Sequence, residues 1–135
     1  MTTAYKLGAT YTPERTTFHV WAPNAGQVEV YLVDSERSVP MQRDDEGYFT
    51  GHAAGIAPGT RYFYRLDGGK ERPDPATRSQ PDGVHGPSAV VDPAFAWTDS
   101  GWVAPTLRNS VMYELHVGTF TDAGTFDAAV DRLDH

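Results

Sequence analysis

The chain has 135 residues, enough for one domain or for one domain with part of a second. It carries 18 acidic against 11 basic residues, a formal charge of -7, which disfavours nucleic acid or another polyanion as the ligand. There is no cysteine, so neither a disulfide framework nor thiolate chemistry is available. No apolar signal segment or bilayer-length apolar run is visible, so we predict a cytoplasmic protein without a membrane partner.

Short alternating runs broken by turn residues occupy residues 7–66, which predicts an antiparallel β-sandwich. The first clear runs are "TFHVWAP" and "QVEVYLVD". Successive side chains of a strand point to opposite faces, so in each run one set of alternate side chains faces the core. The inward positions predicted in this way are Phe18, Val20, Ala22, Val28, Val30 and Leu32. Trp21 lies inside a strand and beside a turn, and we expect it to be packed in the protein.

Two further strands follow turn signals. Tyr48 and Phe49 come after a turn at Asp45–Gly47, and the run "RYFYRL" ends at Asp67–Gly69, a typical hairpin signal. About five or six strands fit into residues 7–66, which suits one small sandwich.

The segment after Gly69 has a different character. "KERPDPATRSQPDGVHGPS" is rich in proline and predicts a loop of defined shape, because proline removes a backbone donor and restricts its neighbour. A short strand-like run follows at Ala89–Val91. Beyond it, Trp97 and Trp102 are expected to dock against a neighbouring domain, with stacking on a sugar ring as the alternative.

The last part of the chain predicts a β/α unit. "SVMYELHVGTF" is apolar on both faces, as expected of a covered parallel strand. The following residues have helical spacing, with Thr125 as the N-cap and Asp127 in the first turn. The apolar positions of this helix are Phe126, Ala129, Val130 and Leu133. A parallel strand needs a parallel neighbour, so we expect the sequence to be cut after the opening unit of a larger α/β fold.

Candidate reactive groups are few. Glu114 faces the same way as His116, and a buried pair of this kind could form an acid with a shifted pKa. A carboxylate in the middle of a strand, however, more often binds a structural partner. Catalytic groups of α/β barrels lie at the carboxyl ends of strands, which favours Gly118, Thr119 and Phe120 as positions that face a site. The five histidines have no ligand-type spacing, and no phosphate-binding glycine loop follows a strand. We therefore predict no metal and no cofactor.

Four segments, in this order, resemble a known family. They are "FHVWAPNAGQVEVYL", "PGTRYFYRLDG", "RPDPATRSQPDGVHGPSAVVDPAFAWTDSGW" and "VMYELHVGTFTDAGTFDAAVDRLDH". Together they are similar to the N-terminal part of the malto-oligosyltrehalose trehalohydrolases, a family of the α-amylase superfamily. The first two segments alone are shared with glycogen branching and debranching enzymes, whereas Arg72–Ser88 and "YELHVGTFT" narrow the resemblance to the trehalohydrolases.

The resemblance implies a mainly β chain in three parts. Residues 1–70 would form an immunoglobulin-like β-sandwich similar to carbohydrate-binding modules, and residues 71–109 a Pro-rich ordered interdomain linker. Residues 110–135 would be the first strand and helix of a truncated (β/α)8 barrel. Arg72, Asp74, Arg78 and His85 are then expected to make interdomain contacts across the seam.

The function implied is hydrolysis of the α-1,4-glucosidic bond next to the terminal trehalose of maltooligosyl-trehalose, with release of trehalose. The resemblance places the catalytic aspartate, glutamate and second aspartate on later barrel strands, beyond His135, so this chain alone is expected to be inactive. The partner, maltooligosyl-trehalose or another α-glucan, would bind mainly through the missing barrel. Trp97, Trp102 and Phe120 are the candidates for substrate contact within this chain.

Two other functions remain open. The chain could be a glucan-binding sandwich, either of a branching or debranching enzyme or free-standing, with Tyr48, Phe49 and Phe63 as exposed aromatic residues. It could also be a purely structural interaction domain that binds no sugar.

Overall fold

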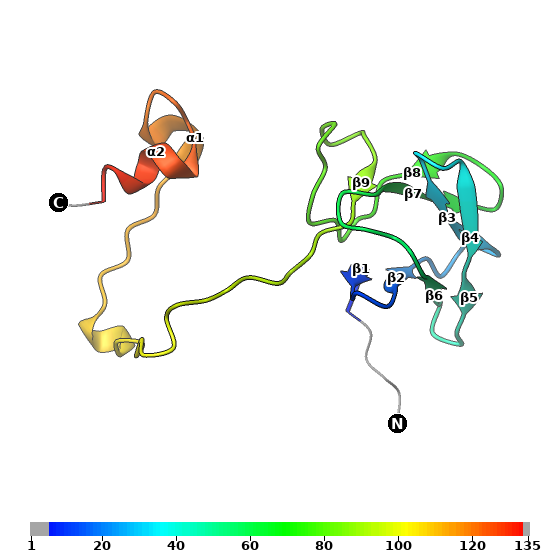
Figure 1. The fold of residues 1–135 in the computed structure, drawn as a ribbon, viewed down its shortest axis with the longest axis horizontal. Coiled ribbons are helices and arrows are strands. Elements are labelled where there is room, and N and C mark those ends of the chain that lie inside the picture. Colours follow the sequence, from blue (N-terminus) through cyan, green and yellow to red (C-terminus); the bar gives the residue numbers. More distant parts are fainter. Residues whose placement is uncertain (1–5, 134–135) are drawn as a thin grey trace. The chain divides into compact units, whose positions relative to one another are not determined.

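The computed structural model describes residues 6–133, which form two compact units that divide between Phe95 and Ala96. In Figure 1 the strands belong to the first unit, and the two short α-helices belong to the second. The described part is therefore mainly β.

The first unit is a sandwich of two antiparallel sheets. The first sheet has the order β1 (Gly8–Tyr11), β2 (Thr16–Trp21), β6 (Tyr48–Ala53) and β5 (Gln42–Arg43). The second has the order β4 (Arg37–Pro40), β3 (Val28–Leu32), β7 (Arg61–Leu66) and β8 (Glu71–Arg72), and β9 (Ser88–Ala89) also pairs with β7. The sandwich predicted from alternation is confirmed.

The core lies between the inner faces of the two sheets. The predicted inward residues of β2 and β3 are buried, whereas Ala22 is partly buried at the edge of the core. The rings of Phe18 and Tyr62 join the two sheets, with centroids 5.0 Å apart in an edge-to-face arrangement. Phe49 belongs to this core and is almost fully buried, so its expected exposure is wrong: it faces inward from β6, opposite Val20 of β2.

The hairpin after β7 forms as predicted. Asp67 and Gly68 both have positive φ, 51° and 66°, the combination that a type I′ turn requires. β8 then returns antiparallel to β7.

The Pro-rich segment belongs to the sandwich. β8 and β9 both pair with β7, and the amide and carbonyl of Val90 bond to Thr60 and Gly59. The boundary expected at residue 70 therefore lies inside the first unit, which extends to Phe95. Pairing with β7 satisfies backbone groups that a free linker would leave to water.

The second unit contains η1 (Leu107–Asn109), α1 (Val117–Phe120) and α2 (Phe126–Val130). The strand expected over Val111–Val117 is absent: residues 111–116 have no ladder, and Val117 begins α1. The described residues provide no parallel neighbour for such a strand, and a strand without a neighbour cannot satisfy its backbone.

The predicted helix near the end of the chain is present as α2. The Thr125 hydroxyl caps it by accepting a hydrogen bond from the Ala128 amide at 3.3 Å. Only Ala129 of this helix is buried, and Phe126 is 77% exposed. Across residues 6–133, no helix has the length and apolarity to cross a membrane.

Candidate functional site

A buried polar cluster fixes the Pro-rich segment to the second sheet. The Tyr62 and Tyr64 hydroxyls both donate to Oδ2 of Asp74, at 2.6 and 3.3 Å. The other carboxylate oxygen accepts the amide of Ala76 at 2.8 Å, and the Asp74 amide donates to Oγ of Ser88. Burial raises the pKa of both tyrosine hydroxyls well above their usual value, and the Asp74 carboxylate adds to this increase. They therefore remain donors to Asp74 at neutral pH.

Arg78 ties the same segment to the first sheet. Its guanidinium donates to the carbonyl oxygens of Ala9, at 2.6 Å, and Leu7, at 3.4 Å. Gly8 lies between these two residues with a φ of 91°, and a Cβ there would be 2.8 Å from the Ala76 carbonyl oxygen. The segment after β8 is thus held on both sheets.

Four residues were predicted to make interdomain contacts. The structure shows Asp74 and Arg78 in hydrogen bonds within the first unit, between segments that are distant in sequence. Arg72 lies in β8, and His85 is exposed in the loop before β9. A role at an interdomain seam stays a prediction for Arg72, Asp74, Arg78 and His85.

A pocket of about 270 Å³ opens at the end of the sandwich, where β2 and β8 approach each other. Its walls are mostly apolar: Val20, Trp21, Ala22, Val28, Tyr64, Leu66, Arg72, Pro73 and Pro75. The proline-stiffened start of the Pro-rich segment therefore forms one wall, and the end of β2 forms the other. A pocket of this kind suits a ligand with apolar faces.

Trp21 stands at this pocket and is 57% exposed, so its side chain is not packed in the core of the sandwich, and packing against a neighbouring domain stays a prediction. Its Nε1 donates to the Glu46 carbonyl oxygen at 3.3 Å, which orients the indole ring. The alternation of β2 already contained the signal, because Phe18 and Val20 point inward and Trp21 must point outward.

The outer face of the first sheet continues from Trp21 as a row of rings and hydroxyls, which we call the β2/β6 row. Register pairs Trp21 with Tyr48, His19 with Thr50, and Thr17 with His52. The row consists of Thr17, His19, Trp21, Tyr48, Thr50 and His52. None of these residues is an aspartate, glutamate, lysine or arginine.

Short contacts hold the row together. His19 Nδ1 and Thr50 Oγ1 are 2.9 Å apart, and His52 Nδ1 and Thr17 Oγ1 are 3.0 Å apart. The rings of His19 and Tyr48 stack nearly parallel, with centroids 5.2 Å apart. Burial lowers the pKa of His19, partly offset by the negative charge of Asp44, so the imidazole is neutral at neutral pH.

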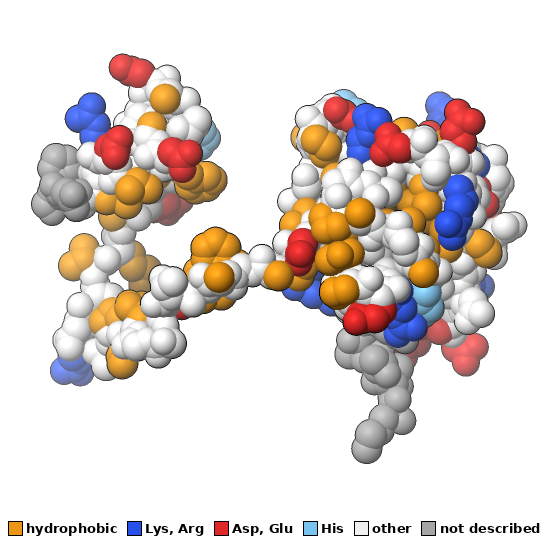
Figure 2. Space-filling model, viewed as in Figure 1, with side chains coloured by type: hydrophobic (Ala, Val, Ile, Leu, Met, Phe, Trp, Pro, Cys, Tyr) orange, Lys and Arg blue, Asp and Glu red, His pale blue; other side chains and the backbone are white. Residues whose placement is uncertain are grey.

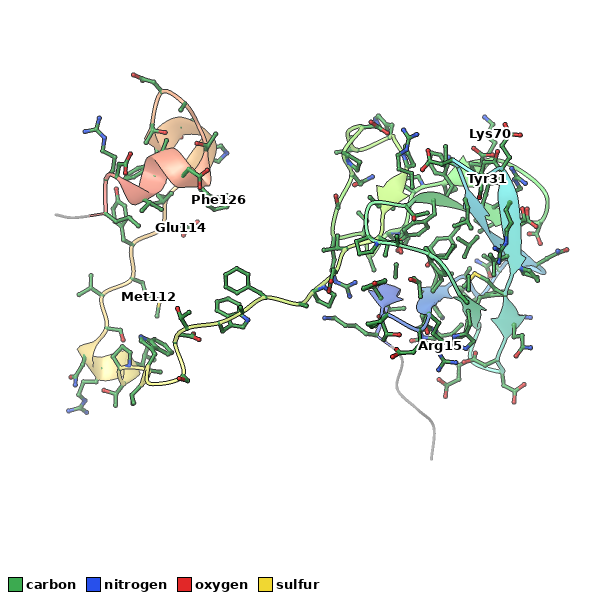
Figure 3. The ribbon with its side chains drawn as sticks, viewed as in Figure 1. Arg15, Tyr31, Lys70, Met112, Glu114 and Phe126 are labelled. Atoms are coloured by element: carbon green, nitrogen blue, oxygen red, sulfur yellow. The ribbon has the colours of Figure 1, made fainter. Side chains whose placement is uncertain are left out.

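The outer face of the second sheet is ionic. Arg65 pairs with Glu29 and Glu71 and lies 4.2 Å from the ring centroid of Tyr31, and Arg61 pairs with two aspartates, Asp34 and Asp82. The bond to Arg61 lowers the pKa of Asp34. Figure 2 shows basic and acidic side chains next to each other in the region where Figure 1 draws β3, β4, β7 and β8, and Figure 3 labels Tyr31 there. The two outer faces of the sandwich therefore differ in chemistry.

The predicted substrate contacts lie in the second unit. Trp97 and Trp102 are 74% and 68% exposed, and Phe120 is half-buried in α1 with its ring 6.5 Å from Tyr113. Glu114 is exposed on the segment before α1, where Figure 3 labels it, and His116 precedes that helix. Gly118 and Thr119 lie inside α1. Contact of Trp97, Trp102 and Phe120 with a substrate stays a prediction.

The chain is similar to one protein-family model and to several known proteins. Residues 6–93 match carbohydrate-binding module 48, the isoamylase N-terminal domain. The chain is 42% identical to a malto-oligosyltrehalose trehalohydrolase of Saccharolobus solfataricus, over 100% of this chain and 23% of that protein. It is 46% identical to a malto-oligosyltrehalose trehalohydrolase of Rhizobium sp. (strain M-11), over 87% of this chain and 21% of that protein. The chain thus spans about a fifth of the length of these relatives.

A solved structure shares the fold over almost the whole chain. The crystal structure of a putative alpha amylase from Salmonella typhimurium is 39% identical and superimposes with a TM-score of 0.84. The match covers 93% of this chain and 22% of that one. The resemblance inferred from the four sequence segments is confirmed.

Proposed function

Because the chain belongs to the carbohydrate-binding module 48 family, we propose that it is the N-terminal, glucan-binding module of a glycoside hydrolase that releases trehalose from maltooligosyl-trehalose. The enzyme would act in the cytoplasm on the α-1,4-glucosidic bond next to the terminal trehalose.

One observation carries the choice of enzyme. The family match ends at residue 93, but the 42% identity to a trehalohydrolase extends over the whole chain. The similarity therefore includes the second unit. A 1,4-alpha-glucan branching enzyme is also similar over 87% of this chain, but at 33% identity, so the higher identity to the trehalohydrolases favours that enzyme type.

In this proposal residues 110–135 are the first strand and helix of the barrel. The extended segment 111–116 would become a strand when a neighbouring barrel strand completes its ladder. The exposed apolar side chains of Val111, Phe126 and Val130 would then be covered. The catalytic carboxylates would come from later barrel strands, so this chain supplies none of them.

The sandwich would contribute glucan binding at Trp21. Pyranose rings present C–H groups that pack on an aromatic face, and the exposed indole beside an apolar pocket offers such a face. The hydrogen bond from Nε1 to Glu46 fixes the ring before the sugar arrives, which lowers the entropy cost of binding.

The activity is tested with two proteins. A longer protein that carries this chain at its N-terminus should release trehalose from maltooligosyl-trehalose, whereas the 135-residue chain should release none. Trehalose release by the short chain, or transfer of glucan chains instead of hydrolysis by the longer protein, would refute the proposal.

Glucan binding is tested by affinity electrophoresis of the 135-residue chain in glycogen. We expect the wild-type chain to be retarded and Trp21→Ala to lose most of the retardation. Tyr31→Ala, which changes a half-buried aromatic residue on the outer face of the second sheet, is the matched control and should migrate like the wild type. Unretarded migration of the wild-type chain would exclude the glucan-binding role.

A second candidate is a glucan-binding module of a branching or debranching enzyme. The observation in its favour is that the family match and the first unit coincide closely, at residues 6–93 and Met1–Phe95. This alternative predicts glucan binding together with chain transfer or debranching by the longer protein.

A further inference from the structure

We infer that the β2/β6 row is an extended α-glucan platform, on which an oligosaccharide lies along the strands with Trp21 at one end. The inference rests on the proposed glucan binding and specifies where the chain of sugars runs beyond Trp21.

The length of the row suits an oligosaccharide. Thr17, His19 and Trp21 alternate along β2 on the outward face, and their partners Tyr48, Thr50 and His52 face the same way from β6. Four residue steps along a strand span about 13 Å. This distance exceeds a single pyranose ring, so several linked sugars would contact the row at once.

The chemistry of the row suits a neutral, polyhydroxylated ligand. It combines two large aromatic side chains with two threonine hydroxyls and the exposed imidazole of His52, whereas His19 is only 8% exposed; none of its members is an aspartate, glutamate, lysine or arginine. Each hydroxyl can donate once and accept twice, so the bonds of Thr17 and Thr50 to the imidazoles leave capacity for sugar hydroxyls. The ionic face of the second sheet would instead have to break its pairs to bind a neutral sugar.

The row is also rigid before it binds. The His19–Thr50 and His52–Thr17 bonds cross between β2 and β6, and Tyr48 is stacked on His19. A platform whose side chains are already ordered loses less conformational entropy when a ligand binds. These contacts distinguish the row from a set of unconnected surface residues.

The test uses maltoheptaose as the probe and the full 135-residue chain, with binding measured by calorimetry. We expect Tyr48→Ala and His52→Ala each to weaken binding by roughly three-fold to ten-fold, the range of one aromatic or hydrogen-bonding contact. Tyr31→Ala is the matched control, because Tyr31 is a half-buried tyrosine on the outer face of the second sheet. It should bind like the wild type.

The outcomes separate this inference from the proposed function. Absence of maltoheptaose binding by the wild-type chain would remove the proposed function itself. If Trp21→Ala weakens maltoheptaose binding but Tyr48→Ala and His52→Ala leave it unchanged, the inference about the row is wrong. The pocket beside Trp21 would then remain the glucan site. A dimer in size-exclusion chromatography that the row variants dissociate would assign this face to a second copy and also overturn the inference. If Tyr48→Ala fails to fold, His52→Ala at its exposed position still tests the inference.

Discussion

The Tyr62 hydroxyl lies 2.6 Å from Oδ2 of Asp74, in the interior of the sandwich, although the two residues belong to a strand and to a Pro-rich loop. Asp74 is only 2% exposed, and Tyr64 donates to the same oxygen. A buried carboxylate is tolerated when hydrogen bonds compensate for its lost hydration. The cluster therefore determines the shape of the loop that forms one wall of the Trp21 pocket.

Replacement of Asp74 should destabilise the first unit strongly. Asp74→Ala would leave two buried tyrosine hydroxyls and the Ala76 amide without their acceptor, and we expect the free energy of unfolding to fall by about 3 kcal/mol or more. Urea unfolding measures the change. Asp45→Ala, at an exposed turn position, is the control and should change stability by less than about 0.5 kcal/mol. A similar small change for Asp74→Ala would contradict the role of the cluster.

Gly8 should tolerate no side chain. Its φ of 91° disfavours any L-residue, and a Cβ would be 2.8 Å from the Ala76 carbonyl oxygen. We expect Gly8→Ala to reduce the free energy of unfolding by about 2 kcal/mol or more, because backbone strain and the clash add together. Gly55→Ala separates the two effects: Gly55 has a φ of 72°, but nothing lies within 4 Å of its Cβ position. Equal losses for both variants would show that the close contact with Ala76 costs nothing.

Alternation of apolar and polar residues predicted the four long strands, β2, β3, β6 and β7. Each of these strands has one set of side chains that is buried and one set that faces outward. The inward positions of β2 and β3 and the hairpin after β7 were predictable from side-chain periodicity and from Asp67–Gly68. β8 was not predicted, and β9 was predicted only as a strand-like run at Ala89–Val91 that overlaps it at Ala89, since two-residue strands have too few positions to show a period. Both strands take their position in the sheet by pairing with β7, which is distant from β9 in sequence.

The candidate site was predicted less well, for two physical reasons. Trp21 was expected to pack because it lies inside a strand and beside a turn, although its position in that strand directs it outward. The strand expected at Val111–Val117 was inferred from apolarity, which predicts burial but does not supply a neighbouring strand. The Asp74 cluster and the β2/β6 row depend on contacts between distant segments, so sequence alone gave no direct signal for them.

The buried imidazole of His19 should make stability depend on pH. Burial lowers its pKa below the ordinary value of 6.5, so the unfolded chain binds more protons than the folded chain when the pH falls through this range. The contribution of neutral His19 is therefore complete above about pH 7 and is lost on acidification. We expect the stability difference between the wild type and His19→Gln to shrink between about pH 7 and pH 5, as measured by urea unfolding. A difference that stays constant over this range would contradict the prediction.

Removal of residues 106–135 should leave the sandwich intact and reduce self-association. The core of the first unit is formed by residues up to Val90, so a chain ending at Pro105 should keep the unfolding midpoint of that unit. The deleted part exposes apolar side chains, with Val111 97% exposed, and unpaired extended segments recruit other chains. Size-exclusion chromatography with light scattering should show less dimer or aggregate for the shorter chain. Equal association of both chains would mean that another surface, such as the β2/β6 row, brings copies together.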